Sequence, residues 1–122
     1  MSSTKPYKFS YGEQINQYTS YNYSAKLLAN TVASITVPYL SNINEGIIAI
    51  MTCRAENDSF VSVACNETPS VPSSSTFSQM PGEMFNEQNI IRKRVSPGDI
   101  LNFISNTNDT YVGVSFYSGN SF

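Results

Sequence analysis

Short runs in which apolar and polar residues alternate are the feature of this sequence that most limits its fold. Ala33, Ile35 and Val37 alternate with polar residues, and residues 112–116 repeat the pattern in the last third of the chain. A period of two places every second side chain on one face of an extended strand, whereas no segment has a convincing helical period. Turn-forming residues recur about every 8–12 residues between the runs. The sequence therefore predicts an all-β protein, an antiparallel, jelly-roll-like β-sandwich of about seven or eight strands.

A central hairpin is predicted around the most apolar run of the chain. Residues 47–51 are apolar on both faces, which is typical of a strand that is buried on both sides. We expect residues 46–53 to pair with residues 59–65 across an intervening turn. Cys53 and Cys65 would then lie roughly 20 Å apart, beyond the limit of about 7 Å between the Cα atoms of a disulfide. The hairpin thus predicts two free, mostly buried thiols.

The chain has the length of one domain, but its first part differs from the rest. Five of the eight tyrosines lie within the first 23 residues, and every second residue from 7 to 11 is aromatic. We therefore expect residues 1–22 to form a tyrosine-rich N-terminal arm or edge strand, and residues 23–122 to form the sandwich. Two alternatives stay open, because the aromatic side chains could cover the domain's own core or anchor the arm on a partner chain. The arm residues expected to make these contacts are Tyr7, Phe9, Tyr11, Tyr18 and Tyr21.

Residues 68–83 form the longest stretch without regular patterning. They contain three of the six prolines and five serines, so we expect a long loop, and long loops in compact domains are often functional. The loop is either a solvated crossover between the sheets or a contact surface. Four apolar residues in or just after it favour contact, namely Phe77, Met80, Met84 and Phe85. Residues 83–90 are compatible with one short helical turn.

Charged residues flank a turn in the last third of the chain. In the sequence SPGD, Pro97 fixes φ at the second turn position and Gly98 tolerates a positive φ at the third, which predicts a type II turn. Asp99 is expected to cap this turn rather than to act in catalysis. Arg92 and Arg94 share one face of the preceding strand. They belong to a solvated edge strand, to a surface that binds an acidic partner or, as the least favoured alternative, to a phosphate-binding site.

Composition excludes several classes of function. Charged residues make up 13% of the chain and the formal net charge is −2, which does not suit a nucleic-acid partner. No run approaches about 18 consecutive apolar residues, so no membrane span is expected, and the start of the chain lacks an apolar leader, which predicts synthesis in a cytoplasm. The chain has no histidine and its carboxylates are scattered. We expect no catalytic site, no metal and no cofactor, and hence no enzyme.

Three motifs together carry a family resemblance: ITVP at 35–38, RVSPGD at 94–99 and VSFY at 114–117. With these motifs in this order, the chain from about residue 25 to residue 117 resembles the small β-sandwich decoration and head-fibre proteins of tailed bacteriophages. The resemblance implies a non-enzymatic auxiliary capsid protein on the virion surface, synthesised in the host cytoplasm. It also implies binding to the major capsid protein or another virion protein, and self-assembly, often as a trimer. The tyrosine-rich arm is not part of the resemblance.

A second function stays open beside this one. A glycan-binding, lectin-like module of a phage fibre or tail would use tyrosine rings and Asn and Ser side chains in loops at one end of the sandwich. These groups can stack on sugar rings and bond to their hydroxyls. The chain contains no tryptophan, the usual stacking residue, which weighs against this alternative.

Overall fold

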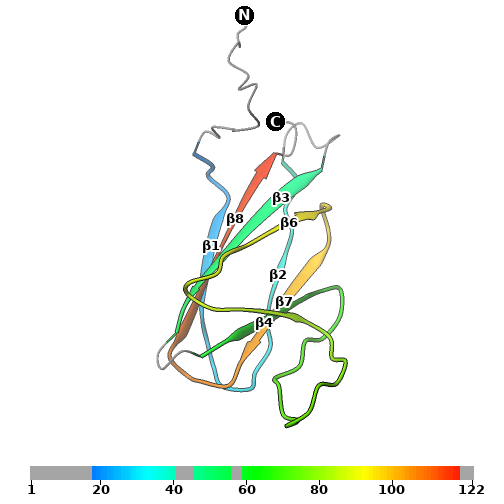
Figure 1. Ribbon diagram of the computed structural model, residues 1–122. Helices are drawn as coiled ribbons and strands as arrows, with labels where there is room; N and C mark the ends of the chain where they lie inside the picture. Colours follow the sequence, from blue (N-terminus) through cyan, green and yellow to red (C-terminus); the bar gives the residue numbers. More distant parts are fainter. Residues whose placement is uncertain (1–17, 41–45, 56–58, 119–122) are drawn as a thin grey trace, which may run out of the picture.

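The protein is a two-layer sandwich of antiparallel sheets (Figure 1). The computed structural model describes residues 18–40, 46–55 and 59–118. Sheet A has the order β1-β8-β3-β6 and sheet B the order β2-β7-β4-β5. The strands of sheet A are β1 (Asn22–Leu27), β8 (Thr110–Ser118), β3 (Ile47–Arg54) and β6 (Ile91–Val95). Those of sheet B are β2 (Ala33–Thr36), β7 (Ile100–Ser105), β4 (Val61–Cys65) and β5 (Glu83–Phe85).

The pairing of the strands is that of a jelly roll. The first half of the chain pairs with the second half in reverse order, as β1 with β8, β2 with β7, β3 with β6 and β4 with β5. The chain is therefore one long double strand folded over on itself, and the contacts of β3 with β8 and of β4 with β7 complete the two sheets. Eight strands arranged in two such sheets are the jelly-roll architecture. The predicted all-β, jelly-roll-like sandwich is confirmed.

The core lies between the two sheets and follows from the alternation in the sequence. Along β3, Ile47, Ala49, Met51 and Cys53 are buried, whereas the residues between them face outward. Along β8 the buried residues include Phe116, which is fully enclosed. Burial of one such side chain contributes about 2–3 kcal/mol relative to its exposure. The period of two thus determines which face of each strand enters the core.

The predicted hairpin between residues 46–53 and 59–65 is wrong. β3 lies in sheet A between β8 and β6, whereas β4 lies in sheet B between β7 and β5. Both strands are rich in apolar residues because each is central in its own sheet, so adjacency in the sequence does not make them partners. Both cysteines are free, as expected, but Cys53 is buried and Cys65 is exposed, so the expectation of two mostly buried thiols fails for Cys65.

The short helical turn considered for residues 83–90 is also absent. Residues 83–85 form β5, and a tight turn follows in which Asn86 and Asn89 form an isolated β-bridge. The amide N–H of Asn89 donates to the carbonyl oxygen of Asn86 at 3.1 Å. Of the three residues of β5 only Phe85 is buried, whereas Glu83 and Met84 are exposed.

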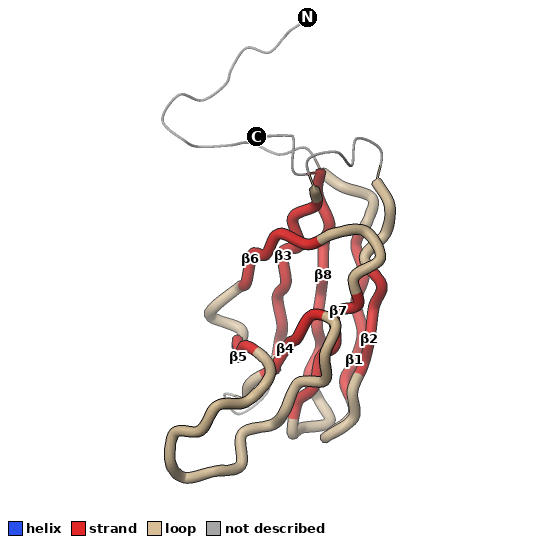
Figure 2. Tube along the Cα trace, turned by 90° about the vertical axis from the view of Figure 1, so that its right-hand side faces the viewer, coloured by secondary structure: helices blue, strands red, loops and turns tan. Residues whose placement is uncertain are grey.

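The two lateral sides of the sandwich differ. At one side β6 and β5 are the edge strands, and Lys93 Nζ on β6 lies 2.8 Å from Glu83 Oε1 on β5, so a salt bridge joins the two sheets. At the other side the edge strands are β1 and β2. The long loop between β4 and β5 extends well beyond the strands (Figure 2).

The two ends of the described chain lie beside one another. Asn22 at the start of β1 pairs with Ser115 near the end of β8. The hydroxyl of Thr19 donates to the carbonyl oxygen of Phe116 at 2.7 Å, and the amide of Phe116 donates to the carbonyl oxygen of Tyr21 at 3.0 Å. The described part of the predicted arm, residues 18–21, therefore lies on the domain's own β8. Tyr7, Phe9 and Tyr11 lie outside the described residues.

Candidate functional site

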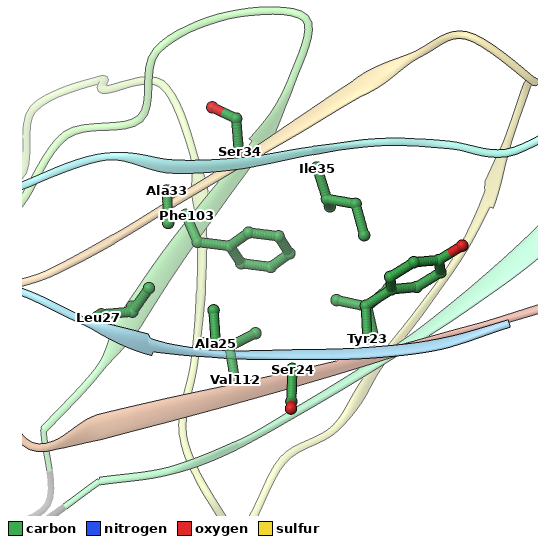
Figure 3. Close-up of a pocket in the computed structure, with 10 residues that line it drawn as sticks. Tyr23, Ser24, Ala25, Leu27, Ala33, Ser34, Ile35, Phe103 and Val112 are labelled. Carbon is green, nitrogen blue, oxygen red and sulfur yellow. The ribbon is translucent and has the colours of Figure 1, made fainter.

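An apolar pocket of about 260 Å³ opens between the edge strands β1 and β2 (Figure 3). Phe103, Val112 and Val114 are buried core residues, so the pocket reaches down to the core. The space exists because two of the inward-facing residues on the edge strands are alanines, Ala25 and Ala33. The other lining residues are Tyr23, Ser24, Leu27, Ser34 and Ile35.

The polar groups of this pocket are few. The side chains of Ser24 and Ser34 point away from the space, whereas Ile35 and Phe103 point into it (Figure 3). Tyr23 lies at one end of the pocket (Figure 3). Its ring packs edge-on against the ring of Phe116, with 5.8 Å between the two centroids. Such a hollow suits an apolar or aromatic side chain of a partner, because its walls offer hydrophobic contact and little hydrogen bonding.

The turn predicted before β7 is present. The amide of Asp99 donates to the carbonyl oxygen of Ser96 at 3.0 Å, and Gly98 has a φ of +91°, as the third position of a type II turn requires. The Asp99 carboxylate accepts hydrogen bonds from the Ser96 amide at 2.9 Å and from Asn66 Nδ2 at 3.1 Å. These bonds hold the pKa of Asp99 below its ordinary value. Its contacts are those of a turn cap.

The two thiols are poor nucleophiles. Burial, with a smaller contribution from the charge of Glu87, raises the pKa of Cys53 to about 11. Partial burial and the neighbouring Asp99 carboxylate raise the pKa of the Cys65 thiol as well. A raised pKa keeps each sulfur protonated near neutral pH, and the protonated thiol is the unreactive form.

The predicted contact residues lie in different parts of the molecule. Arg92 and Arg94 both face outward from β6, across from Ile50 and Ile48 of β3. Tyr18 is fully exposed, and Tyr21 is partly exposed beside β8. Phe77 projects fully into solvent from the long loop, and Met80 is half-buried near its end.

Phe85 is not a surface residue. Only 2% of it is exposed, because it is the inward-facing residue of β5 and pairs with Val61 of β4. Its assignment to a contact surface is therefore wrong. The alternation within residues 83–90 is too short to tell whether an apolar residue faces inward from a strand or belongs to a loop.

Two features were not predicted from the sequence. One is the pocket between β1 and β2, and the other is the set of β3 residues, Ile48 and Ile50, that lie beside Arg92 and Arg94 on the outer face of sheet A. The signal for the pocket was the occurrence of alanine at inward positions of two successive strands, at Ala25 and Ala33. It could not be interpreted without knowing that β1 and β2 are edge strands on the same side of the sandwich. Side-by-side placement of edge strands is a property of topology and not of local sequence.

Comparison with models of known protein families finds no match, and a search of curated proteins finds none either. None of the described segments is a helix that could cross a membrane. The same residues contain no group of three or more His, Cys, Asp or Glu side chains placed to hold a metal ion.

Proposed function

We propose that this protein is a non-enzymatic structural protein of a virus particle, which decorates or projects from the capsid surface through protein–protein contacts. Its partners are the major capsid protein or another virion protein, and further copies of itself. It is synthesised in the host cytoplasm and incorporated into the virion surface. The observation that carries the proposal is the jelly-roll pairing of its eight strands, an architecture shared by viral capsid proteins and lectins.

The placement of the three family-like motifs supports the proposal. The amide of Val37 donates to the carbonyl oxygen of Asp99 at 2.8 Å, and the amide of Gly98 donates to the carbonyl oxygen of Val37 at 2.9 Å. These bonds join the motif at 35–38 to the motif at 94–99. β3 joins the latter to the third motif, because Ile48 pairs with Arg94 on one side and with Tyr117 on the other. Motifs far apart in the sequence therefore meet at one end of the sandwich.

The exposed apolar side chains also support a role in surface contact. Tyr18 and Phe77 are fully exposed, and the pocket between β1 and β2 leaves part of the core accessible at one side. Large aromatic residues are typical anchors of protein interfaces, and pockets at sheet edges receive such anchors. These features give the molecule several places at which another protein surface could bury apolar area.

The proposal is tested by locating the protein in purified particles. Particles from the organism that encodes it are sedimented through a density gradient, and the fractions are probed with antibodies raised against the recombinant chain. We expect the protein to sediment with the particles and to be visible on their outer surface by immunogold electron microscopy. A protein that stays at the top of the gradient contradicts the proposal.

The role of the N-terminal arm is tested with the same particles. A variant lacking residues 2–17 keeps Thr19 and Tyr21, which bond to β8. If the arm anchors the protein, occupancy of particles depleted of the native protein falls with this variant. Undiminished occupancy counts against the arm. Light scattering of the free protein, expected to give the mass of a trimer, tests self-assembly separately.

Glycan binding by a phage fibre or tail module is the second candidate function. It is favoured by Tyr39, which is exposed and lies beside the turn that contains Gly98 and Asp99. Asn66 adds an amide at the same place. A glycan array incubated with the recombinant protein would support this function through selective binding, and uniform lack of binding would oppose it.

A further inference from the structure

The outer face of sheet A concentrates the positive charge of the molecule. The described residues include five Lys and Arg side chains, and four of them project from this face: Lys26, Arg54, Arg92 and Arg94. The fifth, Lys93, has the opposite orientation on β6 and pairs with Glu83 of sheet B. The described acidic residues are Glu67, Glu83, Glu87, Asp99 and Asp109, and none of them belongs to a strand of sheet A. Among the described residues, this face therefore carries most of the cations, and the acidic side chains lie outside its strands.

Strand register places these cations at the border of the face. Lys26 of β1, Tyr111 of β8 and Arg54 of β3 lie in one row across the sheet. Lys26 Nζ lies 5.8 Å from the centre of the Tyr111 ring and 3.7 Å from Asp109 Oδ1. Arg92 and Arg94 lie farther along, on the edge strand β6, with one residue between them. Positive charge is thus found at one end of the face and along one of its edges.

The centre of the same face combines isoleucine and tyrosine side chains with small polar ones. Ile50 lies between Arg92 and Ser115, and Ile48 lies between Arg94 and Tyr117. These central side chains are half-buried among their neighbours, and Tyr111 is 50% exposed. Gly113 of β8 pairs with Thr52 of β3, in the row between that of Tyr111 and that of Ile50. Gly113 adds no side chain, and a Cβ at this position would come within 3.2 Å of the Thr52 hydroxyl. Tyr and Arg are enriched in protein interfaces, and Ile48 and Ile50 add apolar surface between them.

We propose that the outer face of sheet A is a docking surface for an acidic patch on another protein, and this inference rests on the proposed function as a contact protein. Carboxylates of the partner would meet Arg92 and Arg54 at the border, while its apolar residues cover Ile48 and Ile50. Arg favours such contacts because its planar guanidinium binds a carboxylate through two parallel hydrogen bonds. A nucleic acid is a poorer match, because four cations offer few phosphate contacts and the chain carries a net charge of −2.

Two substitutions on one strand give a matched test. Arg92→Gln and Lys93→Gln each remove one positive charge from neighbouring positions of β6, but from opposite faces of the sheet. Arg54→Gln removes a charge from the far end of the proposed face. Binding of the full-length variants to immobilised poly-L-glutamate is measured at about 50 mM and about 500 mM NaCl, since charge pairs at a surface are screened as salt rises. Heparin and a thymidine oligonucleotide serve as polyanions of other classes.

We expect the wild-type protein to bind poly-L-glutamate at low salt and to lose affinity at high salt. Arg92→Gln and Arg54→Gln should each weaken binding by about fivefold to tenfold, mainly through slower association, whereas Lys93→Gln should leave it unchanged. Equal weakening by Arg92→Gln and Lys93→Gln overturns the proposal. Binding to heparin or to the oligonucleotide that is tighter than binding to poly-L-glutamate also overturns it. Unchanged circular dichroism and melting temperature establish that each variant is folded.

A second arm separates this inference from the proposed function. The same variants are added to purified particles depleted of the native protein. If the wild-type protein does not sediment with particles, the proposed virion role fails, and the poly-L-glutamate results still decide whether this face binds acidic polypeptides. If the wild-type protein does sediment and Arg92→Gln sediments equally well at all salt concentrations, the docking face is wrong although the virion role stands.

Discussion

At the scale of single residues, the Asp99 carboxylate connects two loops. It accepts hydrogen bonds from Ser96 and Asn66, and the side-chain oxygen of Asn66 accepts one from the amide of Ile100 at 2.9 Å. This network joins the turn before β7 to the start of the long loop. The hydrogen bonds lower the pKa of Asp99 from its ordinary value of 3.8. The stabilisation that they provide is therefore fully present above pH 3.8 and is lost as the pH falls through the lowered pKa.

Asp99→Asn should reduce the free energy of unfolding at pH 7 by about 1 kcal/mol, because the amide has only one oxygen and cannot accept from both Ser96 and Asn66. Urea denaturation of the two proteins at pH 7 and at successively lower pH values measures the difference. The difference should shrink as the pH falls through the lowered pKa of Asp99, where the wild-type carboxylate takes up a proton. A difference of the same size at every pH value contradicts the assigned role.

The two thiols should react at different rates. Cys65 is exposed, whereas Cys53 is buried with a pKa of about 11, so iodoacetamide at pH 8 should label Cys65 first and Cys53 only after denaturant is added. Mass spectrometry of peptides measures the two rates. The stability contributed by the protonated Cys53 thiol is present below pH 9.0 and is lost as the pH rises toward 11. Equal labelling of both cysteines in the folded protein would show that Cys53 is not enclosed.

At the scale of elements, the base of the long loop is packed onto the outer face of sheet B. Pro69 is buried, and the amide of Ser70 donates to the carbonyl oxygen of Pro81 at 3.1 Å, which closes the loop. Gly82 has a φ of +106°, and a Cβ at this position would clash with the Ser62 hydroxyl and lie 3.0 Å from Pro69 Cβ. The Ser62 hydroxyl is buried and has no hydrogen-bond partner among the described residues. The close contact of the loop thus leaves one polar atom unsatisfied.

Gly82→Ala should lower the free energy of unfolding by about 2–3 kcal/mol, through its positive φ and its collision with Ser62. Ser62→Ala should leave stability unchanged or raise it by up to about 1 kcal/mol, because it removes an unsatisfied buried hydroxyl. In the double variant the cost of Gly82→Ala should be smaller, since the colliding oxygen is gone. Thermal and urea denaturation of the four proteins gives the coupling. Strictly additive effects would show that the two positions are not in contact.

Sequence patterns predicted strands more successfully than strand partners. Alternation in residues 33–37 and 112–116 indicated β2 and β8 because one face of each strand enters the core. The pairing of β3 with β6 and β8 depends on residues far away along the chain, such as Ile91 for Met51 and Ser118 for Ile47, and no local pattern records it. The predicted hairpin failed for that reason, and Phe85 was misplaced because the three residues of β5 are too few to define a period.

At the scale of the whole molecule, the jelly-roll pairing joins the first strand to the last. The hydroxyl of Ser115 donates to Asn22 Oδ1 across 93 positions of the sequence. Folding must bring such distant segments together before their contacts are formed, and loop-closure entropy makes this slow. We expect refolding from urea to take milliseconds to seconds, measured by stopped-flow tyrosine fluorescence. Relaxation in microseconds would contradict this picture.

The same dependence on topology limited the prediction of the candidate surfaces. Arg92 and Arg94 were recognised as sharing a face because they lie on one strand. Lys26 and Arg54 join them only through the register of β1, β8 and β3, which brings together residues from opposite halves of the chain. The turn at Asp99 was predictable because its four residues are contiguous. Sites built from one segment could thus be predicted, whereas those built from several could not.

The neighbouring positions of β1 and β8 have a further consequence, for circular permutation. A chain rejoined through its natural ends and reopened in the exposed turn between β5 and β6 would keep every pairing of the two sheets. The β1–β8 contact would change from the most distant pairing in the sequence to one between consecutive strands. Such a permutant should reach the native state faster than the parent, with its interior unaltered. The order in which the strands are connected would then govern only the speed of folding and not the final structure.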